Sequence, residues 1–168
     1  MTRQGTAGPD GSDSTTGELS KAVAQFLTMA RVARLATAGP DGEPHNVPVC
    51  FCFDGARFYF VVDNKPKRRA GTEIKRMRNL IANPCVALLV DHYEEEWNHL
   101  AFVLVHGRAQ VVESPEEYLF ALRCLRDKYP QYREMALSPE NNPVVRIDAE
   151  RLHAWGARFM ADAPAQPR

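Results

Sequence analysis

The sequence lacks any long apolar run, since none approaches the roughly 20 residues of a membrane-spanning helix. Its first twenty residues contain no apolar core of the kind found in secretory signals. It also lacks a charge excess, because 21 basic side chains balance 21 acidic ones. General nucleic-acid and acidic-membrane binders usually carry a basic surplus, so neither partner is expected. The expected compartment is the cytoplasm.

Cysteine is scarce, with four residues in a chain of 168. Cys50 and Cys52 form a C-x-C pair, but no second cysteine pair or histidine at ligand spacing completes a zinc site. We therefore predict no metal. The four cysteines are expected to be reduced and to act as small hydrophobic side chains.

The chain length fits one domain. Residues 1–19 are rich in Gly, Ser, Thr and Asp without apolar periodicity, which predicts a disordered N-terminal tail. Residues 159–168 are predicted to form a flexible C-terminal tail for the same reason. The folded domain is expected to span 20–158.

Apolar periodicity predicts both strands and helices along this domain. We expect six strands, at 32–39, 44–53, 57–63, 85–93, 100–112 and 142–155, and three helices, at 17–31, 72–83 and 114–129. Asp54-Gly55 is a strong hairpin signal, so the first three strands are predicted to form a meander. Ser114 and Pro115 are typical of a helix start. Because hairpins link most strands, the predicted fold is mainly β, an antiparallel β-barrel with peripheral helices.

The stretch 65–79, KPKRRAGTEIKRMRN, carries seven basic side chains and one acidic side chain, Glu73. Helical spacing predicts a core face of three apolar residues, Ile74, Met77 and Ile81. The opposite, solvent-facing stripe holds four hydrogen-bonding side chains, Thr72, Lys75, Arg76 and Asn79. A helix start also offers free backbone N–H groups to an anion, so the stripe suits a phosphate or another multiply charged anion. The same residues equally fit the ordinary charged side of a surface helix.

Four motifs follow one another over about residues 20–156, VARLATAGPDGEPHNVPV, FYFVVDNKPKR, IKRMRNLIANPCVALLVDHYEEEW and VLVHGRAQVV. Their order and spacing resemble the pyridoxamine-phosphate-oxidase-like split-barrel family. Within it, the chain resembles most the flavin/deazaflavin oxidoreductase group and its coenzyme F420-dependent members. The resemblance implies a split β-barrel, similar to FMN-binding proteins, in a homodimer with two cofactor sites at the interface.

The resemblance also implies which residues bind the cofactor. In such proteins a basic helix and the preceding loop hold the cofactor phosphate, which corresponds here to Lys65, Lys67, Lys75, Arg76 and Asn79, with Thr72 as a lesser candidate. Two strands lie near the cofactor ring, which corresponds to Asn46, Val47, Pro48, Val49, Val61, Val62 and Asp63. Trp97 and Trp155 resemble residues that reach the site from the partner subunit. Pro48 also fits an ordinary edge-strand proline, and each tryptophan also fits a buried or interface aromatic.

The activity that the resemblance implies is hydride transfer between coenzyme F420 and a small, hydrophobic, unsaturated substrate. The chain lacks the Arg-x-x-x-x-Lys strand motif and the C-terminal Arg-containing segment of the vitamin-making oxidases, which disfavours pyridoxamine phosphate oxidation. An FMN-dependent oxidoreductase and a non-catalytic flavin, deazaflavin or tetrapyrrole carrier stay open as alternatives. An RNA-binding barrel is disfavoured because no aromatic stacking pair accompanies the basic run. No proton donor is assigned among the four histidines on or near strands, His45, His92, His99 and His106.

Overall fold

The structure is a computed structural model, and it describes residues 12–15, 19–63 and 74–162. One antiparallel sheet forms its centre, in the order β3-β2-β6-β7-β8-β5-β4, with β1 paired to β8. The strands are β1 (Ser12–Thr15), β2 (Ala33–Ala38), β3 (Pro44–Val49), β4 (Cys52–Phe53), β5 (Arg57–Val61), β6 (Cys85–His92), β7 (Ala101–Val111) and β8 (Val144–Trp155). The α-helices are α1 (Lys21–Met29), α2 (Lys75–Ala82) and α3 (Pro115–Lys128), and the short 3-10 helices are η2 (Trp97–His99), η3 (Pro130–Arg133) and η4 (Ala157–Asp162).

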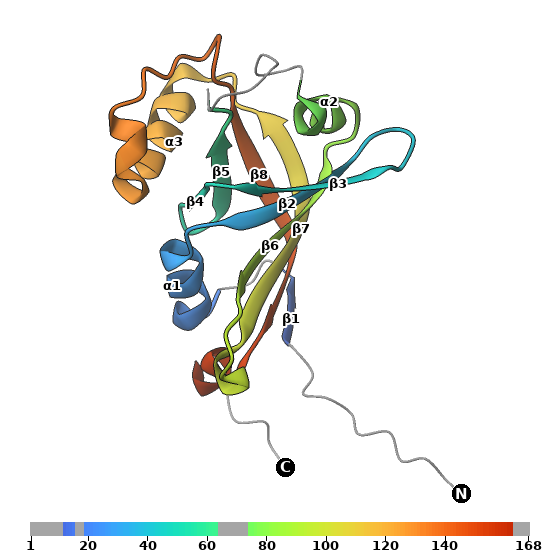
Figure 1. The fold of residues 1–168 in the computed structure, drawn as a ribbon, viewed down its shortest axis with the longest axis vertical. Coiled ribbons are helices and arrows are strands. Elements are labelled where there is room, and N and C mark those ends of the chain that lie inside the picture. Colours follow the sequence, from blue (N-terminus) through green and yellow to red (C-terminus); the bar gives the residue numbers. More distant parts are fainter. Residues whose placement is uncertain (1–11, 16–18, 64–73, 163–168) are drawn as a thin grey trace, which may run out of the picture.

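The sheet curls into a half-barrel with the helices around it (Figure 1), which confirms the predicted mainly β fold. Alternate strand residues point into an apolar core, including Leu35, Leu88, Val103, Val105 and Ile147, each at most 1% exposed. A second apolar cluster joins α3 to the outer side of β4 and β5, where Cys52 and Tyr59 contact helix residues. Each large apolar side chain buried in this way contributes on the order of 1.5–3 kcal/mol.

The predicted strand 44–53 is divided into β3 and β4, which lie at opposite ends of the strand order. β3 pairs with β2 and β4 pairs with β5, so the two halves keep the two neighbours predicted for the meander. Between the halves, the N–H of buried Phe51 donates to the Tyr129 hydroxyl at 3.0 Å. That hydroxyl also lies 2.9 Å from the carbonyl oxygens of Phe51 and Arg31. Tyr129 therefore replaces the hydrogen bonds that a continuous strand would have made.

Two parts of the predicted tails have defined positions. Ser12–Thr15 pairs with Arg151–Ala154 of β8, which differs from the predicted disorder for these four residues. β5 pairs only with the first part of β8, Val144–Asp148, so backbone groups further along the same edge are open to β1. In the predicted C-terminal tail, the ring of Phe159 packs edge-on against Phe26 of α1, with 5.3 Å between the ring centroids.

Local turn and capping signals act as the sequence predicted. The Asp54 carboxylate accepts hydrogen bonds from the N–H groups of Ala56 and Arg57 at 2.8 and 2.7 Å, and Gly55 has a φ of +105°. Ser114 accepts a hydrogen bond from the Glu117 N–H at 3.3 Å, at the start of α3.

All four cysteines are free thiols. Within the described residues, no helix is long and apolar enough to cross a membrane, and no group of three or more candidate metal ligands occurs.

Lys128 joins the end of α3 to the place where β3 and β4 separate. Its Nζ lies 3.9 Å from the centre of the Phe51 ring and donates to the carbonyl oxygen of Leu27 at 3.2 Å. Burial lowers the pKa of this ammonium group from 10.5 to about 8, and the positive charge of Arg31 acts in the same direction. The folded protein therefore releases this proton at a lower pH than the unfolded chain does.

We expect the free energy of unfolding to respond to this difference between pH 8 and 10.5. In that window the unfolded chain binds more protons, so the contribution of Lys128 to stability increases as the pH rises. Its size is on the order of 1–2 kcal/mol after allowance for solvent screening. Urea unfolding of the parent and of Lys128→Met is measured at several pH values. The contribution of Lys128 is the change with pH in the difference between the two free energies of unfolding. The matched control is Lys21→Met at an exposed position of α1, and parallel pH curves for parent and Lys128→Met would contradict the expectation.

Candidate functional site

The face that α2 presents to the core matches the predicted face only in part, since Ile74 and Met77 pack on the core as predicted. Met77 and Leu80 are 0% and 4% exposed, whereas Ile81 is 66% exposed, so the prediction of Ile81 as a core residue is wrong. Asn79 was predicted to face solvent, yet it is only 6% exposed. Its side-chain amide donates to the Thr37 hydroxyl of β2 at 3.1 Å. Because this hydrogen bond satisfies the amide, the helix can turn Asn79 toward β2 and Ile81 outward.

Lys75 stays at the surface, at the first position of α2. Its Nζ lies 2.7 Å from a carboxylate oxygen of Glu43, which precedes β3, so the pair connects α2 to the β2–β3 hairpin. Burial lowers the pKa of His45 on β3, and the positive charges of Lys75 and Arg76 lower it further. The side chains of Lys75 and Arg76 thus make the electrostatic potential more positive where α2 meets β3.

Arg76, the next residue of α2, is partly buried. Its Nε atom is buried and has no hydrogen-bond partner within the described part of the chain. Burial lowers the pKa of the guanidinium, and the negative charge of Asp63 opposes this effect. A buried donor without an acceptor costs about 1–3 kcal/mol. A ligand that brings an acceptor to this atom would therefore be stabilised.

Arg76 lines a cavity of about 110 Å³ where β3, β5, α2 and η3 meet. The other lining residues are Pro48, Val49, Cys50, Val61, Asp63 and Tyr132. Five residues that were predicted to bind the cofactor are therefore brought together here, Pro48, Val49, Val61, Asp63 and Arg76. Complete small-molecule pockets measure roughly 300–1,000 Å³. The cavity is thus large enough for only one part of such a ligand.

Asp63 and Tyr132 provide further polar groups of the cavity. Asp63 is 6% exposed, and the Tyr132 hydroxyl donates to its Oδ2 atom at 3.1 Å. Burial raises the pKa of Tyr132, and neighbouring Cys50 and Asp63 act in the same direction, so the hydroxyl keeps its proton. Sequence reasoning missed Tyr132 and Cys50. Tyr132 lies in η3, 69 residues after Asp63, and no local pattern marks it as a partner.

The other residues predicted near the ring do not line this cavity. Asn46 is exposed, Val47 packs half-buried against the core, and Val62 is 1% exposed within the core. Three residues predicted near the phosphate lie outside the described residues, Lys65, Lys67 and Thr72.

Trp97 and Trp155 are remote from the cavity within one chain. β8 begins at Val144, which pairs with Val61 beside the cavity, and it ends eleven residues later at Trp155. A strand of that length extends about 36 Å. Trp97 is 73% exposed in the β6–β7 connection, at the same distant end of the sheet. Figure 1 shows α2 at the opposite end, so either tryptophan would reach the cavity only from a second chain.

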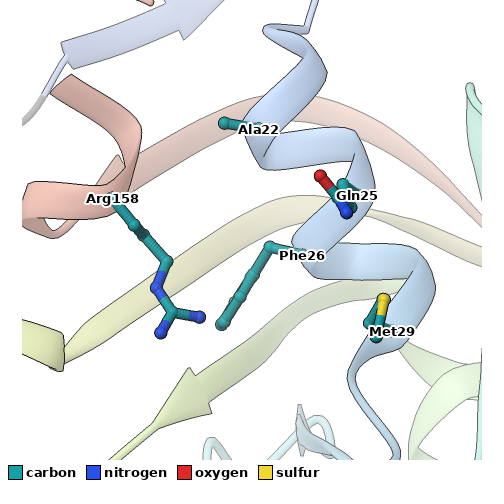
Figure 2. Close-up of a pocket in the computed structure, with 5 residues that line it drawn as sticks. All are labelled: Ala22, Gln25, Phe26, Met29 and Arg158. Atoms are coloured by element: carbon teal, nitrogen blue, oxygen red, sulfur yellow. The ribbon is translucent and has the colours of Figure 1, made fainter. Parts of the chain in front are cut away.

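A second hollow, of about 430 Å³, lies between α1 and η4 (Figure 2). It is lined by Ala22, Gln25, Phe26, Met29 and Arg158. The Arg158 guanidinium already lies 5.4 Å from the centre of the Phe26 ring, and Met29 is 69% exposed. This hollow therefore offers weaker evidence of a ligand than the cavity around Arg76.

Comparisons with known proteins agree with the geometry. A family model described as pyridoxamine 5'-phosphate oxidase matches residues 19–156. A 5a,11a-dehydrotetracycline/5a,11a-dehydrooxytetracycline reductase from Streptomyces rimosus subsp. rimosus is 28% identical over 132 residues, which cover 78% of each chain. The crystal structure of a conserved hypothetical protein from Mycobacterium tuberculosis is similar, with a TM-score of 0.67 and 25% identity over 89% of this chain and 92% of that one. An FAD-binding protein from Mesorhizobium loti shares the fold, with a TM-score of 0.60 and 22% identity over 86% and 96% of the two chains.

Proposed function

The chain belongs to the pyridoxamine 5'-phosphate oxidase family, and from this premise we propose that it is an oxidoreductase with a flavin-type cofactor. Coenzyme F420 is the cofactor that we propose, with FMN as the alternative. The proposed substrate is a small, hydrophobic molecule with an electron-poor double bond. The Streptomyces relative supports this reaction class, because its name describes a reductase of an unsaturated tetracycline.

The observation that carries the proposal is the cavity around Arg76. Its buried Nε donor has no partner within the described residues, and the Asp63–Tyr132 pair lies on the same cavity. Apolar side chains of Pro48, Val49 and Val61 complete the lining. Apolar walls with a few placed polar groups are typical of small-molecule sites.

The described residues fit such a cofactor. Pro48, Val49 and Val61 would lie against the ring, and Pro48 leaves its part of β3 without an N–H group that needs a strand partner. Lys75 is proposed to bind the cofactor phosphate together with Lys65, Lys67 and Thr72. Asn79 is proposed to act indirectly, by holding α2 on β2 through Thr37. The bound cofactor supplies the hydride chemistry, while the protein binds it, orients it and excludes water.

The proposed active form is a homodimer with a cofactor site at each interface. On the outer face of the sheet, Leu89, Leu104 and His153 lie side by side on β6, β7 and β8, and all are half-buried. Phe102 stacks on Trp155 on the same face, with 5.6 Å between the ring centroids. A second copy on this face would cover these apolar side chains. It would also bring the distant Trp97 and Trp155 toward the partner's cavity.

Side-by-side titration of coenzyme F420 and FMN tests the proposed function. We expect F420 to quench the fluorescence of Trp97 or Trp155 and to bind more tightly than FMN. We also expect the reduced deazaflavin to be oxidised when an enone, such as a dehydrotetracycline, is added. A yellow FMN spectrum in the purified protein would favour the alternative cofactor. Binding without oxidation of the reduced cofactor by any enone, quinone or biliverdin would favour a carrier, and no binding of either cofactor would reject the proposal.

A further inference from the structure

We propose that the hollow between α1 and η4 binds an organic anion with flat apolar rings, its rings on Phe26 and Met29 and its charge on Arg158. This site goes beyond the proposed function and does not depend on the proposed cofactor. In Figure 1, the red η4 lies at the end of the sheet opposite α2. Within one chain, the hollow is therefore a second site, remote from the cavity around Arg76.

The hollow has the size and the apolar walls of a small-molecule site. Its volume of about 430 Å³ lies within the range of roughly 300–1,000 Å³ that such sites occupy. Phe26 is half-buried, and Met29 is 69% exposed although it is a large apolar residue. Apolar surface gathered in a concave place is typical of a ligand site, whereas single scattered apolar residues are ordinary. The walls therefore favour a ligand with an apolar body.

Arg158 brings a positive charge to the hollow that no acidic residue balances. Among the side chains that the structure describes, no carboxylate lies within ion-pair distance of Arg158. The facing helix α1, KAVAQFLTM, contains Lys21 and no acidic residue. An anionic ligand would supply the missing negative charge, so charge complementarity favours an anion over a neutral molecule.

The guanidinium of Arg158 is held in place while most of its donors stay available. Figure 2 shows its side chain reaching from η4 toward Phe26, with the central guanidinium carbon 5.4 Å from the centre of the ring. This is a cation–π distance. Among the described residues its only hydrogen bond is a long one, 3.5 Å to the carbonyl oxygen of His99. Because a guanidinium has five N–H donors, it can still bind a carboxylate, sulfonate or enolate through two of them.

The ring of Phe26 favours a flat ligand over a compact anion such as phosphate. Phe159 packs edge-on against this ring with 5.3 Å between the centroids, so contacts with Phe159 and Arg158 fix its orientation. The part that stays exposed is a rigid flat surface, on which a ring packs at low entropic cost. Met29 has a flexible thioether that adapts to the ligand's shape. The site therefore combines a rigid wall, an adaptable wall and one cation.

The test uses two fluorescent probes that share their rings and differ in charge. 8-Anilinonaphthalene-1-sulfonate is an aromatic anion of the proposed class, and N-phenyl-1-naphthylamine is the same molecule without the sulfonate. Both are titrated into the parent, Arg158→Gln and Arg123→Gln. We expect Arg158→Gln to weaken binding of the sulfonate by about ten-fold or more and to leave the uncharged probe unchanged. Arg123→Gln, at an exposed position of α3, is the matched control and should change neither affinity.

A second substitution tests the apolar wall. We expect Met29→Gln to weaken both probes by about three-fold or more, because both lose apolar contact. Leu119→Gln, at a residue 58% exposed on α3, is its matched control and should leave both affinities unchanged.

Two results would overturn the inference. Equal affinity of the parent and Arg158→Gln for the sulfonate would show that Arg158 does not bind the anion. Failure of the parent to bind the sulfonate would show that the hollow does not take this class of ligand. Neither result bears on the proposed oxidoreductase, because these titrations contain no cofactor. The uncharged probe also reports whether the Arg158→Gln variant keeps the hollow intact.

Discussion

Replacement of Leu104 by glutamate is expected to give a monomer that binds F420 or FMN about 100-fold more weakly than the parent. Leu104 is a half-buried residue on the outer face of β7, and its strand neighbours are Leu89 and His153. If a second copy covers this face, the new carboxylate is buried without a partner, which costs several kcal/mol. A 100-fold loss corresponds to about 2.7 kcal/mol, well within that cost.

Light scattering coupled to size-exclusion chromatography measures the oligomeric state, and the same samples are titrated with cofactor. Leu119→Glu is the matched control, because Leu119 is 58% exposed on α3 and outside the proposed interface. It should leave both properties unchanged. A Leu104→Glu dimer with parental affinity would show that this face is not the interface. A monomer with parental affinity would show that one chain completes the cofactor site.

Tyr129→Phe is expected to lower the free energy of unfolding by about 2–3 kcal/mol, although it removes only one oxygen atom. The hydroxyl accepts from the Phe51 N–H and lies within hydrogen-bond distance of the carbonyl oxygens of Phe51 and Arg31. Phe51 is 1% exposed, so water cannot replace the lost partner without local opening. An unsatisfied buried polar backbone group costs about 1–3 kcal/mol.

Urea unfolding of the parent and variant, followed by circular dichroism, measures this loss. Tyr93→Phe makes the same chemical change at a residue that is 74% exposed, and we expect an effect within about 0.5 kcal/mol there. Equal stability of parent and Tyr129→Phe would mean that the connection between β3 and β4 tolerates its unpaired N–H. Because Cys50 in that connection also lines the cavity, cofactor binding should weaken when the connection loosens.

Local chemistry explains why much of the fold was predictable. Alternation of apolar residues in β7 places Val103 and Val105 in the core, at 0% exposed. The Asp54-Gly55 turn and the Ser114 cap each depend on hydrogen bonds within three residues along the chain. All residues that produce such a signal lie within a few positions of one another in the sequence. They therefore predicted the elements, and the motif order predicted the family.

The candidate site was predictable only in part. Pro48, Val49, Val61, Asp63 and Arg76 were expected at the cofactor, and the cavity brings them together. The rotation of α2 was not predicted, because it depends on the hydrogen bond between Asn79 and Thr37, residues 42 positions apart. Helical periodicity finds an apolar face, but it does not reveal a polar side chain whose partner comes from another element.

The sequence by itself determined where most of the strands lie, the start of α3, the family and the concentration of positive charge at α2. Only the tertiary structure decided where the strand 44–53 divides, which way Arg76 turns, and that Tyr132 meets Asp63. These features depend on pairs such as Phe51–Tyr129 and Asp63–Tyr132, whose members are 78 and 69 residues apart. Periodicity and turn chemistry are set by neighbours along the chain. A buried polar group, in contrast, is satisfied by whichever distant residue the fold brings to it, and that partner leaves no local pattern.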